Sequence, residues 1–351
     1  MPTIILTGGG TAGHCTPNLA LIPYLTEKFD KIYYIGSKNG LEKNLVKKEG
    51  IEYFSIPCAK LKRNFSLSNL TIPFHFINGI KDSKKILKKL KPDVIFSKGG
   101  YVSLPVVIAG CKLKIPVISH ESDISLGLAN KIASKFSNKL LTTFPETVKE
   151  VKNGVYVGTP LRKNIFNTNK KTALKKYKFN GEKPIIFITG GSQGSYAINK
   201  AVIESLTELL PKFDILHQCG KNNLSKEKLP KGYVQVEFID NIEDAYAISD
   251  VCIARAGANT VFELLALKKP TLLIPLPKGA SRGDQVLNAE YFQKRGLVSV
   301  LPQNVLTAKS LTQNVNALYS NRFNVKRSFE KTENFNGCQK ISQILFDYIK
   351  K

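Results

Sequence analysis

The sequence predicts an α/β protein made of two doubly wound domains, each a parallel β-sheet with helices on both faces. Short apolar runs alternate with segments of helical period along most of the chain, as expected for parallel sheets. The alternation stops at a polar, lysine-rich stretch, 163–183, and then starts again. The length of 351 residues also exceeds what one ordinary hydrophobic core holds. We therefore expect two domains with a boundary near residue 162.

The first half of the chain contains seven candidate strands, each short, apolar and followed by a turn or a helical segment. These strands are Thr3–Leu6, Lys31–Ile35, Glu52–Ile56, Val94–Ser97, Val117–Ser119, Lys139–Thr142 and Val155–Val157. Helical periodicity is clear in Leu41–Lys48 and Phe76–Leu90. Strands separated by helices in this way predict a parallel sheet.

The second half repeats the pattern with six candidate strands. They are Ile185–Thr189, Asp214–His217, Val234–Phe238, Val251–Ala254, Thr271–Ile274 and Val298–Leu301. The first strand of each half is followed by a similar motif, Thr-Gly-Gly, at Thr7 and at Thr189. The C-terminal segment Gln339–Lys350 is amphipathic and could pack on either domain.

The composition indicates the cellular location that we expect for the protein. The N-terminus has neither a basic segment nor a cleavable apolar core, which argues against a signal peptide. No run of 18 or more apolar residues occurs, so we expect no transmembrane helix. Six scattered cysteines without a CxxC pair are typical of reduced thiols in a cytosolic protein.

Charge suggests the kind of partner. Lysine and arginine total 52 against 27 acids, a formal net charge of +25. Such an excess favours nucleic acid, nucleotides or an anionic membrane surface. A generally lysine-rich composition accounts for part of it.

Three glycine loops each lie between a candidate strand and a helical segment. The first contains Gly8, Gly10 and Gly13, which match the G-x-G-x-x-G pattern of dinucleotide-binding proteins. A dehydrogenase needs an acidic residue at the end of the second strand, where this chain has Gly36-Ser37-Lys38. A loop that serves only a tight turn is the other alternative.

The second and third loops make phosphate binding the better interpretation. They are Ser97-Lys98-Gly99-Gly100-Tyr101 and Gly190-Gly191-Ser192-Gln193-Gly194-Ser195. Glycine allows close backbone approach, and helix N-termini offer unpaired amides and a positive dipole end. Amides placed in advance can stabilise a departing diphosphate without a metal. Glu121 and Asp123 are the nearest approach to a metal-binding pair, and we expect neither a metal nor a cofactor.

A fourth segment, 255–263, suggests a nucleotide site in the second half. It reads Arg-Ala-Gly-Ala-Asn-Thr-Val-Phe-Glu and follows a candidate strand. Asn259 and Glu263 are four residues apart and share one helix face. A carboxylate in that position can accept hydrogen bonds from both ribose hydroxyls. The alternative is a solvated acid in an early helical turn, where acids are favoured.

Taken together and in order, these motifs resemble the MurG-type N-acetylglucosaminyltransferases of bacteria. The resemblance covers nearly the whole chain. It rests on GGGTAGH, KGGYVS, HES, GTPLR at 158–162, TGGSQGS, EFIDNI at 237–242, RAGANTVFE and DQVLNA at 284–289. It implies a GT-B fold, with two Rossmann-like domains facing a central cleft, and completion of lipid II for peptidoglycan. It further implies an acceptor- and membrane-facing domain of residues 1–162 plus about 337–351, and a UDP-sugar-binding domain of residues 163–336.

The resemblance also implies site residues. On the acceptor side these are Thr11, Ala12, Gly13, His14, Gly99, Gly100, Tyr101, Glu121, Asp123 and Arg162. On the donor side they are Ser192, Gln193 and Gly194 at the diphosphate, Ile239 at uracil, Ala258, Asn259, Thr260 and Glu263 at phosphate and ribose, and Gln285 at the transferred sugar.

One departure concerns the acceptor side. The family usually has His-Glu-Gln-Asn where this chain has His120-Glu121-Ser122-Asp123. An aspartate accepts hydrogen bonds but cannot donate as an amide does, so the role of Asp123 is open.

The implied reaction is an inverting displacement, which needs a base for the acceptor hydroxyl. His14 is the candidate base, since an ordinary histidine titrates near neutral pH. A positioning or oxyanion-binding histidine is the alternative, and Glu121 is the second candidate base.

The implied partners are UDP-N-acetylglucosamine, lipid I and the anionic cytoplasmic face of the cell membrane, to which the protein would bind peripherally. Residues 60–91 carry nine Lys or Arg, one acid and interleaved apolar residues, a pattern that favours membrane contact. An ordinary packed helix with a solvated lysine face is the alternative. Rival functions are a glycolipid synthase, a UDP-N-acetylglucosamine 2-epimerase and a nucleic-acid-binding protein. The last leaves the three glycine loops unexplained, and we expect no nucleic acid partner.

Overall fold

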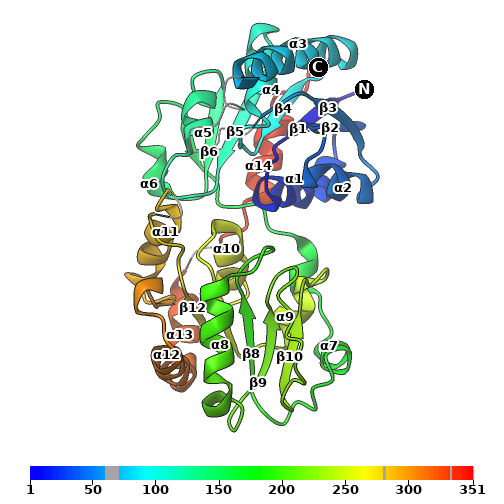
Figure 1. Cartoon of the computed structure of the whole chain (residues 1–351). Coiled ribbons are helices and arrows are strands. Elements are labelled where there is room, and N and C mark those ends of the chain that lie inside the picture. The colour runs from blue at the N-terminus through cyan, green and yellow to red at the C-terminus, as the bar shows by residue number, and fades with distance from the viewer. Residues whose placement is uncertain (60–70, 280–281, 333, 351) are drawn as a thin grey trace. The chain divides into compact units, whose positions relative to one another are not determined.

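The computed structural model describes residues 1–59, 71–279, 282–332 and 334–350. The chain divides into two compact units (Figure 1). Unit 1 comprises Met1–Arg162 and Asn336–Lys351, and unit 2 comprises Lys163–Phe335.

Unit 1 contains a seven-stranded parallel sheet with strand order β3-β2-β1-β4-β5-β6-β7. The strands are β1 (Thr3–Thr7), β2 (Lys31–Ser37), β3 (Glu52–Ile56), β4 (Val94–Ser97), β5 (Val117–Glu121), β6 (Lys139–Thr142) and β7 (Gly154–Tyr156). Strand order reverses between β1 and β4, which pair directly. Ligands of open α/β sheets bind beside the carboxyl ends of the strands at such a reversal. The first and second glycine loops follow these two strands.

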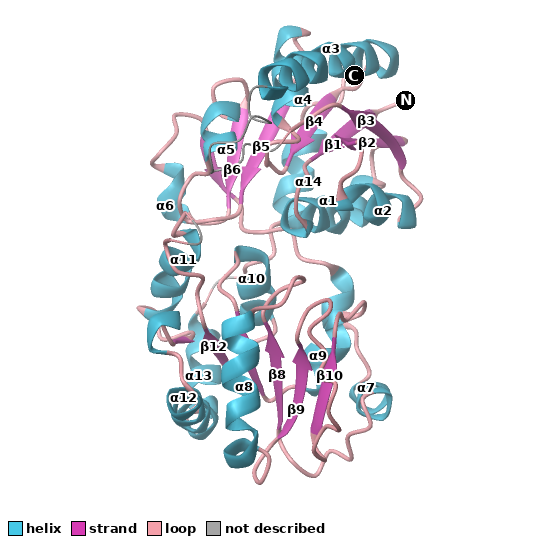
Figure 2. Ribbon diagram, viewed as in Figure 1, coloured by secondary structure: helices cyan, strands magenta, loops and turns pink. Residues whose placement is uncertain are grey.

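Helices cover both faces of the unit 1 sheet (Figure 2). They are α1 (Ala12–Leu25), α2 (Leu41–Lys48), α3 (Ile72–Leu90), α4 (Leu104–Lys112), α5 (Leu128–Ala133), α6 (Pro145–Val148) and α14 (Cys338–Phe346). Successive residues of β1 point to opposite faces. Ile4 and Leu6 pack with α1 and α14, and Ile5 packs with α3 and α4.

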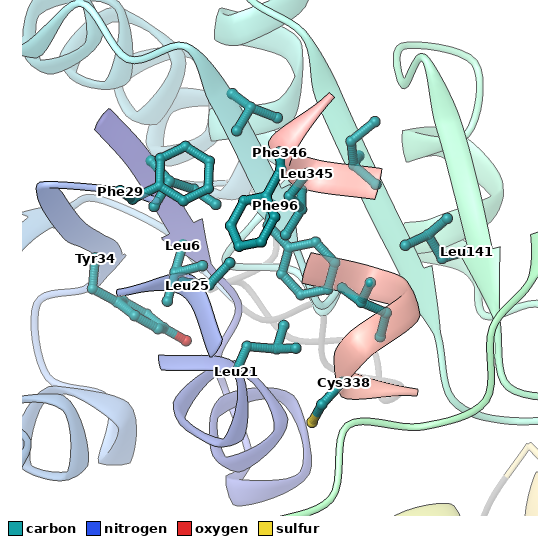
Figure 3. Close-up of a cluster of buried hydrophobic side chains, with 14 of the residues drawn as sticks. Leu6, Leu21, Leu25, Phe29, Tyr34, Phe96, Leu141, Cys338, Leu345 and Phe346 are labelled. Carbon is teal, nitrogen blue, oxygen red and sulfur yellow. The ribbon is translucent and has the colours of Figure 1, made fainter. Parts of the chain in front are cut away.

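The C-terminal helix α14 completes the core of unit 1 (Figure 3). Ile341 and Leu345 are fully buried in the cluster that contains Leu21 and Leu25 of α1. The Phe346 ring centroid lies 5.8 Å from that of Phe29. The sequence pattern left open which domain this amphipathic segment joins, and its apolar face is buried in unit 1.

Unit 2 contains a six-stranded parallel sheet with strand order β10-β9-β8-β11-β12-β13. The strands are β8 (Ile185–Thr189), β9 (Asp214–Gln218), β10 (Tyr233–Val236), β11 (Val251–Ala254), β12 (Thr271–Leu273) and β13 (Ser299–Val300). Order reverses between β8 and β11. The third glycine loop and segment 255–263 follow these two strands.

The helical segments of unit 2 include short 3₁₀ turns, labelled η. They are η2 (Lys163–Phe166), α7 (Lys170–Lys176), α8 (Tyr196–Leu209), α9 (Ile242–Ile248), α10 (Ala258–Ala266), α11 (Asp284–Gln293), η3 (Gln303–Val305), α12 (Ala308–Ser320), α13 (Arg322–Ser328) and η4 (Phe329–Lys331). The strands and helices confirm the predicted α/β class with two parallel sheets.

Some predicted boundaries were wrong. Helix α3 begins at Ile72 rather than Phe76, because Pro73 falls in its first turn, where no amide hydrogen bond is lost. Strand β10 ends at Val236 rather than Phe238, and the chain then turns into α9. Strand β13 keeps only Ser299–Val300 of the predicted Val298–Leu301, and it pairs with β12 at the sheet edge.

Candidate functional site

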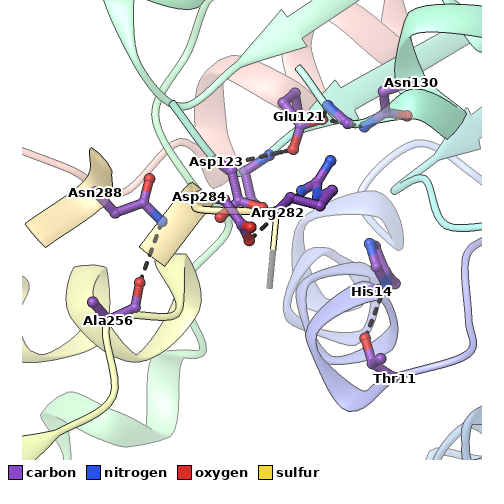
Figure 4. A network of polar contacts seen from close by, with 11 residues as sticks. Thr11, His14, Glu121, Asp123, Asn130, Ala256, Arg282, Asp284 and Asn288 are labelled. Atoms are coloured by element: carbon purple, nitrogen blue, oxygen red, sulfur yellow. Dashed lines mark hydrogen bonds and ion pairs between the residues drawn. The ribbon is translucent and has the colours of Figure 1, made fainter. Parts of the chain in front are cut away.

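The first glycine loop of unit 1 joins β1 to α1 and fixes His14. Thr11 is the N-cap residue of α1, and Ala12 begins the helix. The Thr11 hydroxyl lies 2.9 Å from His14 Nδ1 (Figure 4). His14 is half-buried, whereas Thr11 and Gly13 are exposed. One ring nitrogen of His14 is therefore held by the loop.

The second glycine loop follows β4 and packs on the first. Gly100 has φ +81°, and a Cβ built on it would lie 2.6 Å from the carbonyl oxygen of Gly9 and 3.3 Å from His14 Nδ1. A Cβ on Gly10 would lie 2.4 Å from the Tyr101 ring. A side chain at either glycine would push the loops apart. The two loops thus form one continuous surface beside His14.

A buried carboxylate supports the first loop. Glu42, in the first turn of α2, is fully buried. Its oxygens accept hydrogen bonds from the Gly10 amide at 3.3 Å, from the Ser37 amide at 3.0 Å and from the Ser37 hydroxyl. Glu42 therefore connects the end of β2 to the first loop. Strand β2 itself ends at Ser37, so the acid that a dehydrogenase would need there is absent from the strand end.

Glu121 organises the loop that follows β5. One carboxylate oxygen accepts from the amides of Ser122 at 2.8 Å and Asp123 at 3.1 Å. The other accepts from the Gly127 amide and from Asn130 Nδ2, both at 3.0 Å (Figure 4). Glu121 is 5% exposed, and both oxygens are engaged by this loop and α5. This geometry fits a residue that shapes the loop.

The structure keeps the other acceptor-side residues within unit 1. Asp123 is half-buried in the loop after Glu121, one strand beyond Gly99 at the end of β4. Arg162 is half-buried and ends the first segment of unit 1. Its GTPLR motif reaches the β5 end, because His120 Nε2 lies 3.0 Å from the Gly158 carbonyl oxygen.

In unit 2, the third glycine loop leads directly into the N-terminus of α8. Gly194 has φ +75°, and a Cβ built on it would lie 1.9 Å from the Cys219 carbonyl oxygen. The Ser195 side chain caps the helix by accepting from the Ile198 amide. Ser192 and Gln193 are exposed. The loop is thus pressed against the end of β9, with its exposed residues ahead of a 14-residue helix.

Gln218, the last residue of β9, connects two predicted donor-side segments. Its Nε2 donates to Thr189 Oγ1 and to the Gly191 carbonyl oxygen, both at 3.2 Å. Its Oε1 accepts from the Ile239 amide at 3.0 Å. The Ile239 amide hydrogen is therefore already used. A uracil ring placed at Ile239 would therefore face the backbone carbonyl group of this residue.

Helix α10 presents the polar residues of segment 255–263. Asn259, Thr260 and Glu263 are half-buried, and Ala258 is buried. The Tyr246 hydroxyl donates to Glu263 Oε2 at 2.9 Å, which orients the carboxylate. The predicted helical placement of Asn259 and Glu263 is confirmed.

Arg255 has a structural role at the switch point of unit 2. Its guanidinium donates to the carbonyl oxygens of Ile274 and Pro275, to Ser195 Oγ and to Gln303 Oε1. Burial lowers the pKa of Arg255 from its ordinary value. These bonds join β12, α8 and η3 behind the third loop.

Helix α11 carries the residue predicted for the transferred sugar. Gln285 Oε1 accepts from the Leu276 amide at 3.0 Å, so its Nε2 group is the part that can donate to a ligand. Asn288, one turn on, is fully buried and donates to the Ala256 carbonyl oxygen at 3.3 Å (Figure 4). Helix α11 is thereby held against the start of α10.

Neither a metal centre nor a membrane span is found in the described ranges. Within them, no cluster of three or more His, Cys, Asp or Glu side chains is placed to bind a metal ion. None of the helices described combines the length and the apolar character needed to cross a bilayer.

Sequence reasoning missed three residues that shape these loops. In the sequence, Glu42 resembles an ordinary acid in the first turn of a helix. Lys98 is one of many lysines, and Gln218 is an ordinary polar residue at the end of a strand. Motif position offered one signal, because Lys98 directly precedes the Gly-Gly pair of the second loop. Nothing local distinguishes the other two.

Comparison with protein families matches both units. The glycosyltransferase family 28 N-terminal domain matches residues 4–142, and the family 28 C-terminal domain matches residues 185–344.

Similar proteins extend over the full chain. A UDP-N-acetylglucosamine--N-acetylmuramyl-(pentapeptide) pyrophosphoryl-undecaprenol N-acetylglucosamine transferase of Clostridium botulinum is 48% identical and covers 100% of both chains. The protein of the same name from Clostridium tetani is 48% identical and covers 98% of each chain.

Solved structures agree on the fold. The crystal structure of Acinetobacter baumannii MurG has a TM-score of 0.77 at 24% identity, covering 99% of this chain and 100% of that one. A UDP-GlcNAc 2-epimerase from Neisseria meningitidis has a TM-score of 0.68 at 15% identity, covering 99% of each. The shared architecture is the GT-B fold predicted from the sequence motifs. Because both domain models match and full-length relatives are 48% identical, the chain belongs to glycosyltransferase family 28.

Proposed function

We propose that this enzyme transfers N-acetylglucosamine from UDP-N-acetylglucosamine to the 4-hydroxyl of the N-acetylmuramyl residue of lipid I, which yields lipid II for peptidoglycan synthesis. The observation that carries the proposal is 48% identity over the whole chain to relatives named for this transfer. The contacts around the three glycine loops supply a mechanism.

Unit 2 holds the UDP part of the donor in this proposal. The diphosphate binds at the third loop, where the free amides and dipole of α8 favour negative charge. Uracil lies at Ile239 and donates its ring N–H to the backbone carbonyl. Glu263, oriented by Tyr246, accepts hydrogen bonds from the ribose. Gln285 donates to the transferred sugar. As the sugar–phosphate bond breaks, the same amides stabilise the charge that develops on UDP.

Unit 1 holds the acceptor. The surface of the first two loops receives its diphosphate and sugar, and His14 removes the proton from the 4-hydroxyl. The contact with Thr11 determines which ring nitrogen of His14 accepts this proton. When Nδ1–H donates to the Thr11 hydroxyl, Nε2 carries the lone pair that acts as the base. Thr11 thus selects the active tautomer. The hydroxyl then attacks the anomeric carbon from the side opposite UDP, which inverts its configuration.

Transfer of labelled N-acetylglucosamine from its UDP donor to a water-soluble lipid I analogue tests the proposal. We expect product from the wild type and a loss of about 100-fold or more in kcat for His14→Ala, because general base catalysis contributes about 10²–10⁴-fold. His75→Ala is the matched control, because His75 is exposed on α3. Release of a free epimerised sugar without the acceptor would instead identify an epimerase.

A second variant tests the donor side. Glu263→Ala should raise the KM for UDP-N-acetylglucosamine by about tenfold, since a hydrogen bond to a charged group contributes about 1.5–3 kcal/mol. Glu204→Ala is its control, because Glu204 is exposed on α8. An unchanged donor KM in Glu263→Ala would remove this residue from the ribose site.

We also propose that helix α3 binds the anionic membrane surface that carries the acceptor. Phe74 is 71% exposed and Ile77 is 51% exposed, although both are large and apolar. Lys81, Lys85 and Lys88 are exposed on the same helix. Such a face combines apolar insertion with attraction to acidic lipids. The rest of the basic segment, residues 60–70, lies outside the described residues.

Vesicle sedimentation tests this surface. Reversal of Lys84, Lys85 and Lys88 to Glu should abolish binding to vesicles that contain acidic lipid, because each basic residue near such a surface contributes about 1 kcal/mol. Reversal of the exposed Lys226, Lys228 and Lys231 in unit 2 changes net charge equally and should leave most binding intact. Equal losses in both triple variants would mean that net charge alone drives binding.

A further inference from the structure

Lys98 is a buried lysine at the start of the second glycine loop. Its amide donates to the Thr7 carbonyl oxygen at 2.9 Å, which fixes the backbone beside the end of β1. The side chain is 1% exposed. An ammonium group withdrawn from water is unfavourable unless it is paired and hydrogen-bonded. Its partners therefore indicate why a lysine is present there.

Two side chains beside β5 accept hydrogen bonds from this ammonium. Lys98 Nζ lies 2.8 Å from His120 Nδ1 and also donates to Ser122 Oγ. His120 Nε2 faces the Gly158 carbonyl oxygen at 3.0 Å, and a carbonyl can only accept. The proton of the neutral imidazole is therefore on Nε2. Nδ1 is left with a lone pair that points at Lys98.

The charges around Lys98 belong to the acceptor-side loop. Burial lowers the pKa of Lys98 from 10.5 to about 8, and the nearby carboxylates of Glu121 and Asp123 oppose part of this shift. Lys98 is thus mainly protonated at neutral pH. Burial, and then the positive charge of Lys98, hold the pKa of His120 well below its ordinary value, so His120 stays neutral.

The loop from Glu121 to Gly127 also depends on the Lys98 ammonium group. Glu121 is almost fully buried and holds the amides of Ser122, Asp123 and Gly127. A buried carboxylate needs a compensating charge as well as hydrogen bonds. Lys98 supplies a positive charge and also binds the Ser122 side chain within that loop. It accompanies the His-Glu-Ser-Asp motif, in which Asp123 carries a second negative charge.

Resting on the proposed function, we propose that Lys98 is a positioning residue for the acceptor site, which locks the loop from Glu121 to Gly127 and balances the charge of Asp123. The Asp123 side chain then accepts a hydrogen bond from a hydroxyl or amide of the acceptor. Asp123 directly follows Ser122, to which Lys98 donates a hydrogen bond, so we expect substitutions of Lys98 and Asp123 to have coupled effects.

A double-mutant cycle on acceptor kinetics tests the pairing. Lys98→Met should lower kcat/KM for a lipid I analogue by about 100-fold, because a buried carboxylate that loses its cation is strongly destabilised. Asp123→Asn alone should lower it by about tenfold. The double variant should recover at least about tenfold over Lys98→Met, since coupled neighbours are not additive. Losses that simply multiply in the double variant would overturn the pairing.

The kinetic parameters also separate positioning from general damage. The KM for UDP-N-acetylglucosamine should stay within about twofold of wild type in all three variants, because Lys98 lies in unit 1. Wild-type activity should fall as pH rises above about 8, where Lys98 loses its proton. Lys98→Arg keeps the positive charge at that pH and should lose this alkaline fall. Retention of the fall in Lys98→Arg would contradict the role of Lys98.

Nitrogen NMR of the four histidines supplies a readout that does not require turnover. In the wild type, His120 should have its proton on Nε2, and its Nδ1 signal should titrate near pH 8 with Lys98. Lys98→Met should abolish that titration. A His120 signal unaffected by pH and by the substitution would overturn the inference even in an active enzyme. A wild type that gives this titration and transfers no sugar would instead refute the proposed function.

Discussion

The loops of unit 1 and unit 2 occupy the same place in their sheets, at the reversal of strand order, but are supported by different chemistry. In unit 1, the buried charged groups Glu42, Lys98 and Glu121 hold the loops. In unit 2, the neutral Gln218 ties the third loop to Ile239. His217 and Asn199 behind it form a second neutral network. The loops of unit 1 are therefore held by hydrogen bonds of buried charged side chains. In unit 2 the side-chain amide of Gln218 acts together with the Arg255 guanidinium, which donates to Ser195 Oγ at the end of the third loop.

The difference suits the proposed ligands. A buried carboxylate next to the third loop would repel a nucleotide diphosphate, and an amide fixes the same geometry without adding negative charge. In the proposed function, Asp123 of the acceptor-side loop accepts a hydrogen bond from the acceptor, and Lys98 supplies positive charge to that loop. The comparison predicts that unit 1 is the more sensitive to single charge changes.

The largest effect is expected from Glu42→Gln. The glutamine keeps one oxygen, but its NH2 group directs a donor at either the Gly10 amide or the Ser37 amide, and this should destabilise unit 1 by about 2–3 kcal/mol, the cost of a broken hydrogen bond to a charged group. The KM for the acceptor should rise while the affinity for UDP stays unchanged. Chemical denaturation and UDP titration calorimetry measure the two effects. Glu49→Gln, exposed at the end of α2, is the control.

A smaller effect is expected from Gln218→Met, which keeps the shape of the side chain but removes its hydrogen bonds to Thr189, Gly191 and Ile239. UDP should bind about tenfold more weakly, because each neutral hydrogen bond contributes about 0.5–1.5 kcal/mol. Acceptor KM should not change. Calorimetry with Gln339→Met, exposed on α14, serves as the control. A loss of acceptor affinity instead would contradict the division of roles between the units.

The smallest expected effect is the pH dependence of stability that His217 contributes to unit 2. Burial lowers the pKa of His217 from 6.5 to about 4, so the folded protein keeps this group neutral while the unfolded chain takes up a proton as pH falls through 6.5. Its stabilising contribution is therefore complete above 6.5 and declines towards pH 4. Between pH 7 and 5.5 the loss should be about 1 kcal/mol, and denaturant unfolding of wild type and His217→Gln measures it.

Lys98 predicts a change in stability on the alkaline side of the pH profile. Its lowered pKa means that the unfolded chain binds the proton more tightly than the folded protein between pH 8 and 10.5. Stability should therefore rise with pH across that interval, and this rise should be missing in Lys98→Met. The activity of the wild type should fall over the same range. A parallel fall in stability and activity would argue against a buried, protonated Lys98.

The sequence by itself determined the α/β class, the two sheets and the place of each glycine loop between a strand and a helix. These features depend on the local periodicity of apolar residues and on the conformational freedom of glycine, both of which can be recognised in the sequence. Its motifs likewise identified the family, and Asn259 and Glu263 share a helix face as their spacing predicted.

Tertiary structure alone decided which polar side chains hold the loops. Glu42 lies 32 residues from Gly10, Lys98 lies 22 residues from His120, and Gln218 lies 21 residues from Ile239. Each pair meets because neighbouring parallel strands end at the same edge of a sheet. Tertiary structure also buried α14 in unit 1 and set the hydrogen bonds by which Glu121 holds the loop after β5. Burial and partner geometry set the chemistry of a charged side chain, and neither is encoded at the residue's own position.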